Sequence, residues 1–241
     1  VTSAFDLSVG NPVPIAVADT NAVTEHGTTT GAVLANDRDG GLDRDLLTVT
    51  QVNGAAFTAG RPITLPSGAS LTLNANGTYG YSPNGAFNGL AVGQTATDSF
   101  TYQVADGQGG FATATVTLTI TGQNDAPVIV DPVRPGTPID PLRVIPTQVG
   151  ADGSALIPLN VTGYFADPDT GDRLTLSVNP TTLPPGVTFN AATGTFQGTP
   201  TAVASQGGNA GPGLYDVVVT ANDGNGGTVT MCIPTAFVSW T

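Results

Sequence analysis

The stretch FATATVTLTIT, residues 111–121, decides the fold class of this chain. Every second residue from Ala112 to Ile120 is apolar, and threonine fills most of the positions between them. The same alternation runs through DSFTYQV (98–104) and LYDVVVTA (214–221). A period of two is the pattern of a β-strand with one buried face. No stretch of about twelve residues shows a helical period, so the sequence predicts an all-β protein.

Two stretches predict hairpins that join such strands. SLTLNANGTYGYSP (70–83) carries Asn76 and Gly77, a preferred turn pair, between two alternating runs. GVTFNAATGTFQGTP (186–200) follows the same plan around Gly194. The similarity of the two hairpins indicates an internal repeat.

The repeat extends to the segments on both sides of each hairpin. An acidic turn precedes each hairpin, and a strand ending in a glycine-rich acidic turn follows it: LANDRDGG (34–41) and FTYQVADGQGG (100–110) in the first copy, FADPDTGD (165–172) and YDVVVTANDGNGG (215–227) in the second. Each copy is a little over one hundred residues long, the size of a β-sandwich domain. We therefore expect two tandem Greek-key β-sandwich domains.

The boundary between the copies falls in TGQNDAPV (121–128), where one strand ends and a short linker begins. We assign residues 11–122 to the first sandwich and 123–241 to the second. Residues 1–10 are read as a separate N-terminal strand or as the remnant of a preceding repeat. A linker this short predicts domains held end to end.

The composition excludes several classes of partner. The formal net charge is −12, from seventeen Asp, one Glu and six Arg without any Lys. Binding to nucleic acid or to anionic membrane surfaces requires clustered basic residues, and no stretch reaches the roughly 18 apolar residues of a membrane span. Hydrophobic residues make up 39% of the chain, which supports a packed core. The single Cys232 excludes an internal disulfide.

The acids gather in turns that a Greek-key sandwich can return to one end of a domain. In the first copy these are Asp37, Asp39 and Asp106; in the second they are Asp167, Asp169 and Asp223, with Asn124 and Asp125 of the linker at the same end. Carboxylates about 4 Å apart repel by roughly 1 kcal/mol in water and several-fold more near a protein surface. Ca²⁺, which takes six to eight oxygen ligands, would relieve that repulsion better than Mg²⁺ or zinc. The alternative is that each Asp only caps the backbone of its own turn.

The order of these motifs resembles known bacterial repeats. AVTEHG (22–27), ANDRDGG (35–41), FTYQVADGQGG (100–110) and GQNDAPV (122–128) are similar to VCBS-type cadherin-like repeats of large bacterial surface adhesins. The second copy is similar to dystroglycan-type cadherin-like domains and to bacterial Ig-like domains. The order and the double occurrence of the motifs carry the resemblance, since each motif alone is short.

The resemblance implies calcium between the domains. Its ligands would be Glu25, Asn124, Asp125, Asp167, Asp169 and Asp223, with Asp98 as a further acidic candidate. Asp37, Asp39 and Asp106 would serve a junction upstream of the first domain. There the sequence departs from the pattern: GNPVP (10–14) stands in the place of QNDAP (123–127), so Pro12 replaces Asp125.

These features predict a structural role outside the cell. We expect a calcium-rigidified spacer segment of a secreted bacterial surface adhesin or fibre, with neighbouring repeats or subunits end to end as its partners. Without calcium the domains would hinge at the linker. An enzyme is not expected, because His26 is the only histidine and no nucleophile motif is present.

Two alternatives stay open. Residues 1–10 alternate Phe5, Leu7 and Val9 with mostly polar neighbours, so they could donate a strand to another subunit of a self-assembling fibre. The sandwiches could also form a carbohydrate- or protein-binding module with a surface glycan or protein receptor.

Overall fold

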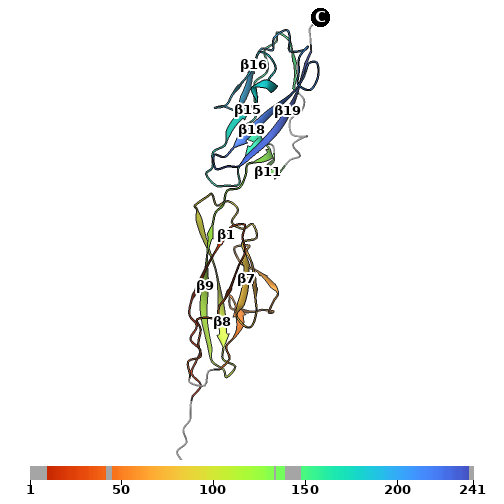
Figure 1. The fold of residues 1–241 in the computed structure, drawn as a ribbon. Helices are drawn as coiled ribbons and strands as arrows, with labels where there is room; N and C mark the ends of the chain where they lie inside the picture. Colours follow the sequence, from red (N-terminus) through yellow and green to blue (C-terminus); the bar gives the residue numbers. More distant parts are fainter. Residues whose placement is uncertain (1–9, 42–44, 133, 139–147, 239–241) are drawn as a thin grey trace, which may run out of the picture. The chain divides into compact units, whose positions relative to one another are not determined.

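The computed structural model describes residues 10–41, 45–132, 134–138 and 148–238 (Figure 1). The chain divides into two compact units, Val1–Gln123 (unit 1) and Asn124–Thr241 (unit 2). Residues 1–9 of the predicted N-terminal strand lie outside the described residues, so that prediction stays as it is. Within the described part of the chain, no helix combines the length and the apolar character needed to cross a membrane.

Unit 1 is a sandwich of two sheets. One sheet has the strand order β1 (Asp19–Thr24), β9 (Phe111–Thr121), β8 (Thr95–Ala105), β3 (Thr48–Val52) and β4 (Ala55–Ala56). The other has the order β2 (Thr29–Ala32), β7 (Thr78–Ser82), β6 (Ser70–Leu73) and β5 (Pro62–Thr64). β1 runs parallel to β9, and the other neighbours are antiparallel.

The alternating residues of unit 1 form its core. Phe100, Tyr102 and Val104 of β8 face inward with the apolar side of β9, and they pack with Leu71 of β6 in one buried cluster. The hairpin predicted around Asn76 and Gly77 is present, with β6 paired to β7. Gly77 has a φ of +84°, which glycine adopts without strain.

Unit 2 repeats the sandwich with shorter strands. Its larger sheet has the order β12 (Gln148–Ala151), β19 (Thr228–Val238), β18 (Leu214–Asn222) and β15 (Thr175–Val178). A three-stranded sheet follows the order β13 (Leu159–Asn160), β17 (Thr195–Gly198) and β16 (Val187–Asn190), and a third sheet the order β11 (Arg134–Pro138), β10 (Val128–Asp131) and β14 (Phe165–Ala166). Two short 3₁₀ helices, η1 (Thr162–Tyr164) and η2 (Pro180–Thr182), complete the described elements.

The long hairpins align the two units residue by residue. β8 and β9 close their turn with Ala105 opposite Phe111, and β18 and β19 close theirs with Asn222 opposite Thr228. Figure 1 shows each hairpin within its own unit. The predicted all-β fold with two tandem sandwich units is confirmed.

A second alignment comes from the start of each unit. Ile15 bridges to Arg38 in unit 1, and Val128 pairs with Ala166 in unit 2. The residue that follows the paired position is Asp39 in unit 1 and Asp167 in unit 2. These two aspartates are therefore structurally equivalent, which pairs the acidic turns differently from the Asp37/Asp167 match that the sequence suggests.

Candidate metal centre

The late turn of unit 2 holds Asp223 in an ionised state. Its Oδ1 accepts the backbone N–H groups of Asn225 (2.7 Å) and Gly227 (3.0 Å), and its Oδ2 accepts the side-chain N–H of Asn124 (3.0 Å). The hydrogen bond from Asn124, with those from the turn backbone, lowers the pKa of this nearly buried carboxyl. The turn thus presents a carboxylate rather than a neutral acid.

The early turn of unit 2 lies beside it and is also tied to the linker. Asp167 Oδ1 accepts the backbone N–H of Asp169 at 2.9 Å. Asp169, which is only 3% exposed, accepts the backbone N–H of Asp125 on Oδ2 at 3.0 Å. Asp172 Oδ2 accepts the side-chain N–H of Asn225 at 2.9 Å, which joins the early turn to the late turn.

These turns concentrate negative charge. Asp167, Asp169 and Asp172 each offer one carboxylate oxygen, and the three oxygens lie within 4.8 Å of one another. Burial raises the pKa of Asp167, and the charges of Asp169, Asp172 and Asp223 raise it further against the hydrogen bond from the Asp169 backbone. The site therefore disfavours ionised Asp167 unless a positive charge compensates it.

Three oxygen atoms of this cluster lack a hydrogen-bond donor. Asp167 Oδ2, Asp169 Oδ1 and Asn124 Oδ1 are buried, and no group within the described part of the chain donates to them. A buried polar atom without a partner costs about 1–3 kcal/mol, and a charged one costs more. These oxygen atoms come from the linker and the early turn, without histidine or cysteine among them, and oxygens are the ligands that Ca²⁺ prefers.

Unit 1 carries one comparable oxygen where its chain ends. Glu25 directly follows β1 and is 1% exposed. Its Oε1 accepts the backbone N–H of Gln123 at 2.6 Å, whereas Oε2 is buried without a donor among the residues described. The predicted ligand Glu25 therefore lies against the last residue of unit 1.

Asp98 has a different environment. Its Oδ2 accepts hydrogen bonds from the hydroxyls of Ser67 and Tyr81, both at 2.7 Å, and its Oδ1 accepts the N–H of Ser99 at 2.8 Å. Both oxygens therefore have donors inside unit 1. This buried acid belongs to no three-residue ligand group in the described chain.

The late turn of unit 1 copies that of unit 2. Asp106 accepts the side-chain N–H of Asn11 at 2.9 Å and the backbone N–H groups of Gln108 (2.7 Å) and Gly110 (2.9 Å). The prediction did not include Asn11. The spacing Asn-x-x-Pro, shared by NPVP (11–14) and NDAP (124–127), could have identified it.

The other two acids predicted for that end have hydrogen bonds of their own. Asp37 Oδ1 accepts the backbone N–H of Val17 at 2.7 Å, and both its oxygens lie within 3.2 Å of the Tyr102 hydroxyl. Asp39 Oδ2 accepts the N–H of Gly41 at 3.1 Å. Among the residues with described positions, Asp37, Asp39 and Asp106 do not come together as a group of three ligands.

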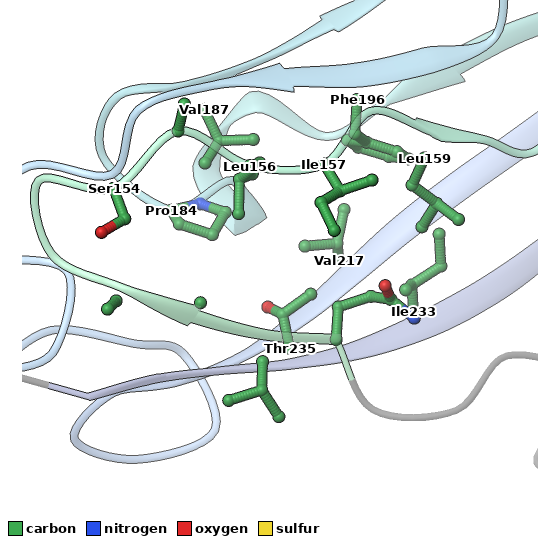
Figure 2. Close-up of a pocket in the computed structure, with 15 residues that line it drawn as sticks. Ser154, Leu156, Ile157, Leu159, Pro184, Val187, Phe196, Val217, Ile233 and Thr235 are labelled. Carbon is green, nitrogen blue, oxygen red and sulfur yellow. The ribbon is translucent and has the colours of Figure 1, made fainter.

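Unit 2 also contains an apolar cavity of about 480 Å³. Figure 2 shows Leu156, Ile157 and Leu159 on one side of it, facing Val217 and Ile233 on the other. None of the described residues that line it is an acid or a base.

The repeat explains why this cavity exists. Val23 of β1 is buried in unit 1 and lies opposite Ile120, while the equivalent position in β12 is Gly150, opposite Phe237. Gly150 lines the cavity and has no side chain to fill it.

Comparisons with known proteins agree with this architecture. Residues 11–122 match the family model described as "Bacterial cadherin-like domain", and residues 138–233 match the one described as "Putative Ig domain". No curated protein matches the chain. These matches identify the type of each domain, and they do not distinguish the VCBS type or the adhesin context that the sequence suggests.

Solved cadherin structures share the fold. Human CDH23 EC21-23 is 17% identical, with a TM-score of 0.51, and the match covers 95% of this chain and 70% of that one. PcdhgB3 EC1-4 is 14% identical, with a TM-score of 0.57 and coverage of 95% and 50%. Mouse cadherin-23 EC22-24 is 14% identical, with a TM-score of 0.50 and coverage of 95% and 65%.

At such identities the likeness concerns the fold alone, and the chain spans only 50–70% of these structures. Neither family model is that of an enzyme. The chain thus consists of two tandem β-sandwich units, the first similar to the bacterial cadherin-like domain and the second to the Ig-like domain, which are domain types of adhesion and structural modules.

Proposed function

We propose that this chain is a calcium-rigidified spacer segment of a secreted bacterial surface adhesin or fibre. The observation that carries the proposal is the set of three buried oxygen atoms in unit 2 that have no donor among the described residues: Asp167 Oδ2, Asp169 Oδ1 and Asn124 Oδ1. A cation is the partner that satisfies such acceptors and offsets the repulsion of the neighbouring carboxylates.

The residues present suit calcium. Asp167, Asp169 and Asp223 supply charge, and Asn124 is oriented for the role because its N–H₂ group already donates to Asp223. The amide oxygen of Asn124 is thereby left to accept from elsewhere. Asp125, whose backbone donates to Asp169, belongs to the proposed set as the linker carboxylate. A bound calcium ion would supply the positive charge that this group lacks.

We extend the proposed set to Glu25. Its carboxylate holds Gln123, and Gln123 is covalently bonded to Asn124. An ion shared by Glu25 and Asn124 would restrain the peptide that joins the two units. By that restraint calcium binding would stiffen the connection between the units. A stiff spacer reaches farther than a flexible chain of the same length.

The proposed location follows from the affinity of such sites. Extracellular calcium modules bind with Kd values of about 10⁻⁴–10⁻³ M, so they fill only where calcium is abundant. The spacer would therefore be stiff on the cell surface, where neighbouring repeats continue it end to end.

Small-angle X-ray scattering with a calcium titration tests the mechanical claim. We expect calcium to narrow the distribution of interatomic distances of the wild-type chain. Glu25→Gln should still bind calcium through unit 2 but should lose that narrowing. Asp216→Asn, which removes an exposed carboxylate outside the acidic turns, is the control. A scattering curve that calcium leaves unchanged in the wild type would refute the spacer mechanism.

The apolar cavity favours one alternative over another. A carbohydrate platform needs exposed aromatic rings, whereas Phe196, the aromatic residue of the cavity, is 7% exposed. A binding function at this cavity would therefore involve a polypeptide rather than a glycan. Binding of apolar peptides that Gly150→Val abolishes would support it, and a chain that binds none would exclude it.

A further inference from the structure

We propose that calcium acts at the Asn124 end of unit 2 and not at the equivalent Asn11 end of unit 1, where two acids of the unit 2 set are replaced and the neighbouring Asp37 faces the Tyr102 hydroxyl. The inference rests on the proposed calcium function and adds which of the two similar unit ends binds calcium. It starts from the alignment of the units, in which Asp39 is equivalent to Asp167.

The alignment shows that unit 1 lacks the second acid of the early turn. Asp167 accepts the N–H of the residue two positions later, Asp169. Asp39 accepts the N–H of the residue two positions later as well, but that residue is Gly41. The backbone arrangement is conserved between the units, while one carboxylate is missing from unit 1.

The segment that enters unit 1 also lacks the acid that Asp125 supplies to unit 2. Asn11 and Asn124 each lie four residues before the bridging residue and donate to the late-turn aspartate. The next residue is Asp125 in unit 2, whose N–H reaches Asp169, and Pro12 in unit 1. Proline has neither a carboxylate nor an N–H, so it can supply neither the ligand nor the hydrogen bond.

A buried hydroxyl in unit 1 lies against several oxygens, and its single proton is donated to one of them or shared between two. Tyr102 is fully buried, and its Oη lies 3.0 Å from the Val33 carbonyl, 3.1 Å from the Val17 carbonyl and 3.1 Å from both Asp19 Oδ2 and Asp37 Oδ2. In this arrangement the O–H donor stands at the centre of an oxygen cluster.

Unit 2 has no such donor at the equivalent position. In the aligned hairpins, the position of Tyr102 is taken by Val219, whose side chain cannot form hydrogen bonds. The contrast appears in the buried oxygens: the Asn124 end has three without a donor among the described residues, while in unit 1 the early turn contributes Asp39 Oδ1 and the segment after it Asp45 Oδ2. Neither aspartate belongs to a group of three ligands in the described chain, and a calcium cage needs six to eight ligands.

The test compares the two ends in one molecule by ¹⁵N NMR of the full chain during a CaCl₂ titration. We expect the amides of Asp169, Asn225 and Gly227 to shift with calcium, while those of Gly41, Gln108 and Gly110 stay within their apo positions. Calcium affinity should fall at least tenfold in Asp167→Asn and be unchanged in Asp39→Asn, its matched partner.

Each outcome has a distinct meaning. Saturable shifts at both ends, or a tenfold loss of affinity in Asp39→Asn, would overturn this inference and leave the calcium function standing. Shifts at the Asn11 end alone would overturn both. A chain without saturable shifts at either end would overturn the calcium function itself, and this inference with it.

Discussion

Asn11 and Asn124 each place one amide group on the aspartate of the late turn. In unit 1 the hydrogen bond from Asn11 is the largest influence that lowers the pKa of Asp106, followed by those from Gln108 and Gly110. A lowered folded pKa contributes stability above the ordinary value of 3.8, and this stability is lost as the pH falls through the folded pKa.

Asn11→Ala should therefore raise the pKa of Asp106 toward 3.8 and reduce the stability of unit 1 at neutral pH. Carboxyl ¹³C NMR titration measures the pKa, and Asn124→Ala, which leaves Asp106 untouched, is the control. An Asp106 pKa that stays at its wild-type value in Asn11→Ala would contradict this role.

Tyr102 is the donor for a cluster of acceptors. Burial, and then the charges of Asp37 and Asp19, raise the pKa of its hydroxyl, so it keeps its proton at every ordinary pH. Tyr102→Phe should cost about 1–3 kcal/mol of unfolding free energy, because buried oxygens lose their donor. Urea unfolding should give the same loss with calcium and with a chelator. Recovery of the lost stability by calcium would show that an ion can replace the hydroxyl.

At the scale of elements, each late turn requires a glycine at the position where the backbone packs directly against the aspartate side chain. A methyl group at Gly227 would overlap the Asp223 carboxylate, and one at Gly110 would overlap that of Asp106. Gly227→Ala should displace Asp223 and weaken calcium binding roughly 10–100-fold, the usual effect of a change that acts through a ligand.

Gly110→Ala is the matched substitution in unit 1 and should leave calcium affinity unchanged. Calorimetric titration of both variants compares them directly. Equal losses of affinity would mean that the two late turns contribute alike, contrary to the asymmetry proposed for the two ends.

The strands and hairpins could be predicted because they follow from local patterns. The alternation in 98–104 and 111–121 became β8 and β9, and the pair Asn76–Gly77 became the β6–β7 turn. The equivalence of the early turns could not be predicted, because it depends on the backbone bridge between Ile15 and Arg38, residues far apart in sequence. The sequence motif Asp-x-Asp pairs Asp37 with Asp167, whereas the bridge pairs Asp39 with it.

The roles of single side chains were predictable only in part. The acids of unit 2 stand in turns, and the predicted Asp167 and Asp169 share a cluster with Asp172, which the prediction did not include. The alternation in 98–104 places Tyr102 on the buried face of its strand, where it lies. The pattern cannot show that its hydroxyl meets oxygens from Val17, Asp19, Val33 and Asp37. Asp98 likewise gains its donors, Ser67 and Tyr81, from strands and turns distant in sequence.

For the whole molecule, the net charge of −12 opposes a compact state, and part of it is concentrated in the turns of unit 2. At calcium about 100 times Kd, binding would add roughly 2.7 kcal/mol, or roughly 10 °C in the midpoint of unit 2. Scanning calorimetry with calcium and with chelator measures this. Sodium chloride at equal ionic strength, which only screens charge, should give a smaller shift. Equal shifts of the unfolding midpoint in calcium chloride and in sodium chloride would mean that calcium only screens the charges and has no specific site.

Calcium binding itself decides whether the buried oxygens of unit 2 form a metal site. We would titrate CaCl₂ into the full chain by isothermal calorimetry, beside the double variant Asp167→Asn/Asp169→Asn. We expect saturable binding to the wild-type chain, with a Kd of about 10⁻⁴–10⁻³ M or tighter, and none to the double variant. A wild-type chain that takes up no calcium, or a double variant that binds it equally well, would contradict the proposed site.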